Sequence, residues 1–107
     1  MSEPISDQVF HILLSLRDRP RHGYGMIQAV EARTDGAFTI GSGTLYSAIK
    51  RMEAEGWIER VDGPDGEDPR RKYYGLTRAG RQVMLAEARR LTELAAYARP
   101  LLPRRGA

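Results

Sequence analysis

Apolar residues at helical spacing open the chain. Between residues 5 and 17 they recur at steps of three and four, on one face of an amphipathic helix, at Ile5, Val9, Ile12, Leu13 and Leu16. From Asp18 to Gly25, a proline and two glycines predict a turn. Beyond it, Met26, Ile27 and Val30 predict a short second helix that ends around residues 34–36.

The pattern is clearest in a third helix. Residues 37–43 form a connection in which a very short strand is expected at 38–40. Ser42 is expected to be the N-cap, because its hydroxyl can accept an unpaired backbone amide, and Gly56 is expected to end the helix. At 100° per residue, three apolar side chains share one narrow sector, namely Leu45, Ile49 and Met52. Small, polar and cationic residues point away from it: Gly43, Ser47, Lys50 and Arg51, flanked by Thr44 and Tyr46.

Two strands and a long helix follow. Residues 57–61 and 71–76 are predicted to pair, and the nine-residue loop DGPDGEDPR between them is too long for a tight hairpin. Tyr73 and Tyr74 should face opposite sides of their strand, with Tyr74 in the core. Thr77 is expected to cap a last helix that runs to about Ala98, before Pro100.

The last helix carries a seam of small and apolar residues at alternating steps of four and three: Met84, Ala88, Leu91, Ala95 and Ala98. This spacing is typical of coiled-coil packing and predicts a dimer helix. Together with Ile5, Val9 and Leu13 of the first helix, the seam would form an isologous interface. The alternative is that this helix folds back on its own domain. The ends, MSEP and PRRGA, are expected to fray.

The length and composition of the chain narrow the classes of protein to which it can belong. The length of 107 residues suits one domain, and the chain has no cysteine for disulfides or thiolate chemistry. No apolar run approaches the ~20 residues of a membrane span, and the N-terminus lacks the order of a signal peptide, so a cytoplasmic location is expected. The net charge is +3, and Lys50 and Lys72 are the only lysines among seventeen cations. This arginine richness suits phosphate binding, but it is equally consistent with a GC-rich genome.

Nothing in the chain predicts catalysis. There are two histidines and no phosphate-binding loop, so no enzyme activity and no cofactor is expected. An acidic cluster resembles calcium ligands but lacks their twelve-residue order, and a solvated turn is the favoured interpretation for Asp62, Asp65, Glu67 and Asp68.

A helix followed by a basic-armed hairpin is the layout of a winged helix. We therefore expect a mainly α fold with a small β-hairpin: a winged helix-turn-helix DNA-binding domain over residues 1–76, and a C-terminal dimerisation helix and tail over residues 77–107.

Three segments, in this order and spacing, resemble PadR-type transcriptional regulators. They are HGYGMIQAVE from His22, GTLYSAIKRMEAEGWIE from Gly43 and RRKYYGLTRAG from Arg70, and the resemblance covers roughly residues 9–82. Ser47 stands where the family usually has proline, and the short tail resembles the compact branch. The resemblance implies a homodimer that binds two inverted half-sites, usually as a repressor, with aromatic or cationic inducers. Some compact members hold a flat ligand between tryptophans of the last helix, but the single tryptophan here, Trp57, lies elsewhere.

The candidate DNA-binding residues fall into three groups. On the third helix, hydroxyls and cations can reach phosphates or bases, from Ser42, Thr44, Tyr46, Ser47, Lys50 and Arg51. Tyr46 could instead pack on the wing. Three adjacent cations sit on the arm of the hairpin, at the start of its second strand, and form a basic arm: Arg70, Arg71 and Lys72. They could contact phosphate, or merely protect a strand edge. Tyr24 resembles a phosphate-contacting position of the family, and His22 is expected to be a turn or cap residue. His11 is expected to pack.

The sequence thus predicts a DNA-binding regulator acting as a homodimer on double-stranded DNA, possible control by a small-molecule effector of unknown identity, and no membrane partner. The alternative is a winged-helix protein–protein adaptor without DNA affinity, which the mild net charge and acidic loop favour slightly.

Overall fold

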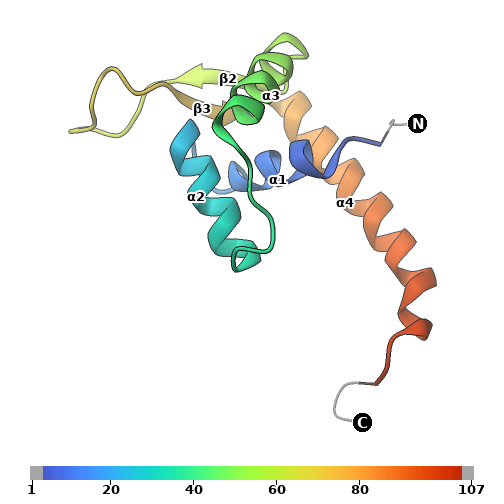
Figure 1. Cartoon of the computed structure of the whole chain (residues 1–107). Coiled ribbons are helices and arrows are strands. Elements are labelled where there is room, and N and C mark those ends of the chain that lie inside the picture. Colours follow the sequence, from blue (N-terminus) through green and yellow to red (C-terminus); the bar gives the residue numbers. More distant parts are fainter. Residues whose placement is uncertain (1–3, 105–107) are drawn as a thin grey trace.

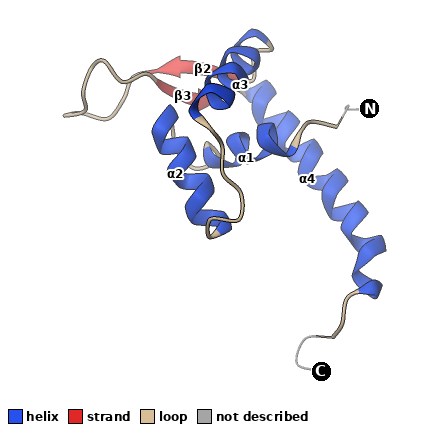
Figure 2. Ribbon diagram, in the orientation of Figure 1, coloured by secondary structure: helices blue, strands red, loops and turns tan. Residues whose placement is uncertain are grey.

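The computed structural model describes residues 4–104, so the fraying expected of residues 1–3 and 105–107 lies outside the described part. Figures 1 and 2 show the first helices of the chain packed together, a small sheet beside them, and a long last helix that extends away from them. In chain order, the elements are α1 (Asp7–Ser15), β1 (Arg21–His22), α2 (Gly23–Thr34), α3 (Ser42–Ala54), β2 (Ile58–Val61), β3 (Tyr73–Leu76), α4 (Arg78–Ala98) and the 3-10 turn η1 (Arg99–Leu101). The predicted fold class, a winged helix-turn-helix with a long C-terminal helix, is confirmed.

The sheet has three antiparallel strands in the order β1-β3-β2. Its third strand is β1, in which Arg21 pairs with Tyr74 and His22 with Tyr73. The short strand expected at residues 38–40 was wrong. There, the Thr34 hydroxyl accepts the backbone N–H of Phe38 at 3.1 Å, and the Phe38 ring stacks on His11 with ring centroids 4.1 Å apart. The amide and the side chain of Phe38 are therefore engaged by α2 and α1 rather than by a sheet.

The core lies where α1, α2 and α3 meet the inner face of the sheet. Leu45, Ile49 and Met52 of α3 are buried in it, as their spacing predicted. α1 contributes Ile12 and Leu13, and the other buried core residues are Val9, Leu16, Met26, Val30, Ile40, Ile58, Tyr74 and Met84. Because α3 buries one face only, its opposite face stays in solvent.

The ends of α3 are set by backbone geometry. Gly41, not Ser42, is the N-cap, and it makes no side-chain capping bond, so the expected role of Ser42 was wrong. Gly56 does end the helix, with a φ of 77° that an L side chain rarely adopts. The N–H groups of Gly56 and Trp57 donate to the carbonyls of Glu53 and Met52 at 3.0 and 2.9 Å, which is a Schellman motif.

α4 starts on a short link to the strand β2. The Thr77 hydroxyl accepts the N–H of Gly80 at 3.0 Å and donates to the carbonyl of Gly56 at 2.5 Å. The N–H of Thr77 donates to the carbonyl of Trp57 at 3.1 Å. Gly80 lies directly on that carbonyl, and a Cβ on Gly80 would overlap it. The predicted cap is confirmed, and backbone meets backbone at this junction.

The two halves of α4 have different environments. In the first half, Met84 and Glu87 are buried against the protomer's own domain, as the fold-back alternative required. From Thr92 to Arg104 every residue is exposed, and Figure 1 shows this half extending away from the other elements. Within residues 4–104, no helix is long and apolar enough to cross a membrane.

Gly80→Ala is expected to lower the free energy of unfolding by about 1–3 kcal/mol, because the new methyl group collides with the rigid Trp57 carbonyl. Gly43→Ala in α3 is the control. It has open space around it, so it should leave stability unchanged or raise it by up to about 1 kcal/mol. Denaturant titrations at one protein concentration measure both variants. Equal stability of Gly80→Ala and the wild type would show that the junction yields.

Candidate nucleic-acid interface

The outward face of α3 is polar and open to solvent. Ser42, Thr44, Ser47, Lys50 and Arg51 are all exposed. Lys50 and Ser47 lie near the middle of this face. Arg51 lies on its flank toward α4, where it lines a groove together with Glu55 and Trp57. The face therefore presents Ser47 and Lys50 centrally, with Arg51 displaced from them.

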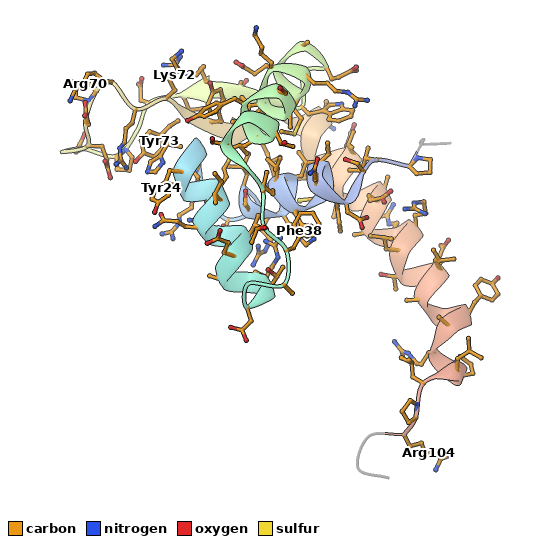
Figure 3. The ribbon with its side chains drawn as sticks, in the orientation of Figure 1. Tyr24, Phe38, Arg70, Lys72, Tyr73 and Arg104 are labelled. Carbon is orange, nitrogen blue, oxygen red and sulfur yellow. The ribbon has the colours of Figure 1, made fainter. Side chains whose placement is uncertain are left out.

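The N-terminus of α2 lies beside α3. His22 caps α2, because its Nδ1 accepts the N–H of Gly25 at 3.0 Å, which confirms the cap interpretation. Gly23 gives room for a close approach, since a Cβ there would lie only 3.1 Å from the hydroxyl oxygen of Tyr46. Tyr46 thus packs on α2 while its ring stays exposed. Tyr24 is 60% exposed and lies at the N-terminal end of α2, on the side of the wing (Figure 3).

The basic arm belongs to a turn rather than to a strand. β3 begins at Tyr73, two residues later than expected, because Asp68 organises the chain before it. Its carboxylate accepts the backbone N–H of Arg70 at 2.9 Å and the Arg70 guanidinium at 3.0 and 3.2 Å, and its carbonyl accepts the N–H of Arg71. These bonds from Arg70 hold the pKa of the Asp68 carboxyl below its usual 3.8. Arg70 is therefore partly neutralised, whereas Lys72 is exposed without an ion pair among residues 4–104.

The α2 terminus, Tyr46 and the basic arm meet around one shallow cavity of about 420 Å³. It is lined by His22, Gly23, Tyr24, Tyr46, Arg70, Arg71, Lys72 and Tyr74. Figure 3 shows Arg70 and Lys72 on the arm above Tyr24. Phenol hydroxyls, guanidinium groups and the positive end of a helix favour an anion, so this cavity suits a phosphate of a nucleic-acid backbone.

Both tyrosines of β3 are buried, each 6% exposed. Tyr74 belongs to the core, as predicted, with the Arg60 guanidinium 6.0 Å from its ring centroid. Tyr73 was expected on the opposite side of the strand, and there the loop covers it. Gly63 lies against its ring, and the ring of His22 meets it edge-on at 5.2 Å. Neither tyrosine offers a free ring face to a base.

His11 packs, as expected. Its ring stacks on Phe38, and the Arg33 guanidinium lies 2.8 Å from its Nδ1. Burial first, and then Arg33, lower the pKa of His11 below the usual 6.5. Burial and Arg71 lower the pKa of His22 in the same way.

The residues expected at a dimer interface divide into two sets. Val9, Leu13 and Met84 are buried in the core of their own chain, so they expose little or no surface to a partner. Ile5, Ala88 and Leu91 are half-buried, and Ala95 and Ala98 are exposed. Only the distal part of the seam is therefore open.

Sequence reasoning missed a groove beside α4. It has a volume of about 1010 Å³ and lies between the N-terminal segment, the end of α3 and the first half of α4. Ile5, Trp57 and Val83 give it an apolar wall. Arg90 closes one side, with its Nη2 2.6 Å from Glu87, which is 3% exposed. These bonds lower the pKa of Glu87 below the usual 4.5. The spacing of Glu87 and Arg90 by three residues was a usable signal for this pair.

The fold defines a class: a winged helix-turn-helix protein, with one polar helix face and a basic wing on the same side of the molecule. The family follows from the sequence itself. Residues 12–86 match the transcriptional regulator PadR-like family, and the chain belongs to that family. It is a DNA-binding transcriptional regulator and not an enzyme.

Known proteins agree with this assignment. A transcriptional regulator of Mycobacterium tuberculosis is 34% identical over 88 residues, which cover 79% of this chain and 76% of that protein. The structure of a transcriptional regulator from Clostridium thermocellum has a TM-score of 0.74 at 25% identity and covers 89% of this chain and 92% of its own. PadR of Bacillus subtilis, solved in complex with operator DNA, shares the fold with a TM-score of 0.67 at 22% identity over 79% of this chain and 48% of its own.

The free energy of unfolding is expected to fall as the pH drops below about 6.5. Both histidines have a lower pKa in the folded chain than the usual 6.5, so the unfolded chain takes up protons first. Their contribution is complete above that pH and declines below it. Asp68 and Glu87, with pKa values lowered from 3.8 and 4.5, lose theirs only in stronger acid. Denaturant titrations between about pH 7.5 and 5.5 measure the slope.

The control for this pH effect is a double variant, His11→Gln with His22→Asn. Asparagine retains an oxygen that can cap α2 but does not titrate, so the slope should largely disappear. A wild-type stability that is constant or rises toward acid would contradict the lowered pKa values.

Proposed function

We propose that this protein is a sequence-specific repressor that binds a palindromic operator as a homodimer. The observation that carries the proposal is the arrangement on one side of the molecule. There the polar face of α3, with Ser47 and Lys50, adjoins the cavity formed by Tyr24, Tyr46 and the basic arm. A helix in the major groove needs such flanking donors, because phosphate contacts fix its register while its own side chains read bases.

Each group then has a distinct role. Lys50 and Ser47 meet base edges or the phosphates that border the groove, while Ser42 and Thr44 contribute hydroxyls from the first turn of α3. Tyr24 and Tyr46 donate to one backbone strand beside the positive end of α2. Arg71 and Lys72 contact the backbone or the minor groove from the wing. Arg70 and Arg51 contribute less, because Asp68 holds the first and the second faces α4.

The homodimer part of the proposal rests on α4. Its apolar stripe is continuous, but the chain's own domain buries it only around Met84 and leaves Ala88 and Leu91 half-buried. Ala95 and Ala98 have no cover within the described residues. Leu94 and Tyr97 are exposed beside it, Tyr97 by 83%. A second copy would lay its own distal α4 over this stripe and over the groove at Ile5 and Trp57. The division into residues 1–76 and a dimerisation segment from 77 onward belongs to the same proposal.

The two-fold symmetry of a homodimer implies a palindromic operator. Two α3 helices about one DNA turn apart, ~34 Å, require inverted half-sites. Repression and release by a small-molecule inducer rest on the family resemblance alone, and no set of residues specifies the inducer's chemistry. The adaptor alternative is the outcome if no DNA binding is found.

Lys50→Ala and Arg71→Ala are expected to weaken DNA binding by about tenfold or more each, because symmetry removes the cation from both half-sites. Each should also lower the slope of log affinity against log salt by about 1 for every phosphate that is no longer neutralised. Gel retardation with fragments from upstream of the gene locates the operator, and a salt titration then measures the slope. For the wild type, ~6–10 phosphate contacts imply a decrease in affinity of about 10³–10⁵-fold between ~50 and ~200 mM salt.

Arg104→Ala is the matched control, since it removes the same charge at the far end of the chain, beyond α4 (Figure 3). It should bind DNA like the wild type. Full-strength binding by the Lys50 or Arg71 variant would remove that residue from the interface. Binding whose affinity does not depend on salt concentration would contradict the phosphate contacts, and no binding to any fragment would favour the adaptor.

Ala98→Glu is expected to turn the dimer into a monomer, because it places a charge on the exposed seam. Ala96→Glu is the same substitution on nearly the opposite face of α4, and it should leave the dimer intact. Sedimentation equilibrium distinguishes the two. If both variants stay dimeric, or both dissociate, the seam does not define the interface.

A further inference from the structure

His22 makes two polar contacts at once, one from each ring nitrogen. Its Nδ1 lies 3.0 Å from the backbone nitrogen of Gly25 and caps α2. Its Nε2 lies 2.7 Å from Nη1 of Arg71, which belongs to the basic arm 49 residues away in the sequence. One imidazole thus joins the helix-turn-helix to the wing.

These two contacts cannot both be hydrogen bonds. A neutral imidazole has one N–H and one lone pair, so only one of its nitrogens accepts. The Gly25 amide and the Arg71 guanidinium are both donors, and arginine has no acceptor to offer in return. If Nδ1 caps α2, then Nε2 carries the proton and faces another donor. If Nε2 accepts from Arg71, Nδ1 carries the proton and the cap is broken. A doubly protonated ring satisfies neither partner.

The surroundings of the ring do not relieve this competition. From β3, Tyr73 meets the ring edge-on, at an interplanar angle of 84°. From the wing, the Glu67 carboxylate lies near enough to raise the pKa of His22, against the larger lowering by burial and Arg71. The preceding Arg21 is directed elsewhere, with its Nε 2.7 Å from the carbonyl of Ser15. Tyr24 and Tyr46 line the adjoining cavity.

We propose that His22 is a positioning residue that couples the wing to α2, because the α2 cap and Arg71 compete for its single lone pair. In the free protein the ring divides its time between two tautomers, one that caps α2 and one that holds Arg71. When Arg71 moves to another partner, the lone pair returns to Gly25 and the first turn of α2, which carries Tyr24, becomes firmer.

One step of this inference rests on the proposed function, namely that the other partner of Arg71 is a DNA phosphate. Capture of Arg71 by the backbone would complete the α2 cap beside the same strand of DNA. Wing binding and ordering of the α2 terminus would then reinforce each other.

The test is a long-range ¹H–¹⁵N spectrum of the histidine rings in the free, full-length protein at neutral pH. The two ring nitrogens of His22 should show intermediate shifts in the wild type, as expected for mixed tautomers. In Arg71→Ala they should separate into the pattern of the Nε2–H tautomer, and exchange of the Gly25 amide should slow by about two- to fivefold. Arg71→Met, which keeps the stem but has no donor, should behave like Arg71→Ala.

Arg70→Ala is the matched control, because it removes the same charge from the same turn, while the Arg70 guanidinium is bonded to Asp68 rather than to His22. It should keep the mixed tautomers of the wild type. A single tautomer in the wild type, or unchanged tautomers in both Arg71 variants, would overturn the competition.

Addition of operator DNA to the wild type should reproduce the Arg71→Ala spectrum. If DNA binds but the tautomers stay mixed, the phosphate step is wrong. If no DNA binds, the proposed function fails, while the spectra of the free variants still decide whether the competition exists.

Discussion

The three apolar side chains that anchor α3 in the core determine which of its other side chains face solvent. Leu45, Ile49 and Met52 occupy one narrow sector and are buried against α1, α2 and the sheet. A rotation of α3 by one residue would carry polar or charged side chains toward this core, and burying an unpaired charge is among the most costly changes that a fold can undergo. The orientation of Ser47 and Lys50 toward solvent is thus fixed by packing on the side they do not touch.

A single stripe on α4 likewise serves two environments. Near the start of the helix the stripe completes the core of its own protomer through Met84, beside the buried pair of Glu87 and Arg90. Further along, the same face is bare. In the proposed dimer, the N-terminal half of α4 would be held in place by its own domain. Its C-terminal half would bind the partner, because nothing in the described part of its own chain covers the apolar face there.

Periodicity alone predicted the parts of the fold that depend on local rules. The inward face of α3, its glycine stop and the Thr77 cap all follow from side-chain spacing and backbone preference, and all three are confirmed. The failures have tertiary causes. β1 is a two-residue strand that exists only because β3 pairs with it, so its own sequence carries no strand pattern. Likewise, the seam of α4 shows that a stripe must be covered, but spacing cannot tell whether the same chain or a copy covers it. Met84, which the spacing assigned to the dimer seam, is buried in its own domain.

The candidate site was predictable as a list of residues but not as an arrangement. Tyr24, Tyr46 and the basic arm come from three separate segments, and the sequence does not show that these segments lie close together in the fold. The turn at Asp68 was signalled by its aspartate–proline pair, yet its consequence, that Arg70 folds back on Asp68 while Arg71 reaches His22, depends on the folded wing. Contacts across 49 residues cannot be inferred from local pattern.

In the proposed dimer, the contact of Gly80 with the Trp57 carbonyl would also help to set the distance between the two α3 helices. Because main chain lies against main chain there, no side-chain rotamer separates the start of α4 from the Trp57 carbonyl. In an assembly of two copies joined at the distal ends of α4, the angle between α4 and the rest of the domain would determine the distance between the two α3 helices. Substitutions on the outer surface of α4 would then change the affinity of the two copies for each other, while the separation of the two α3 helices would stay the same.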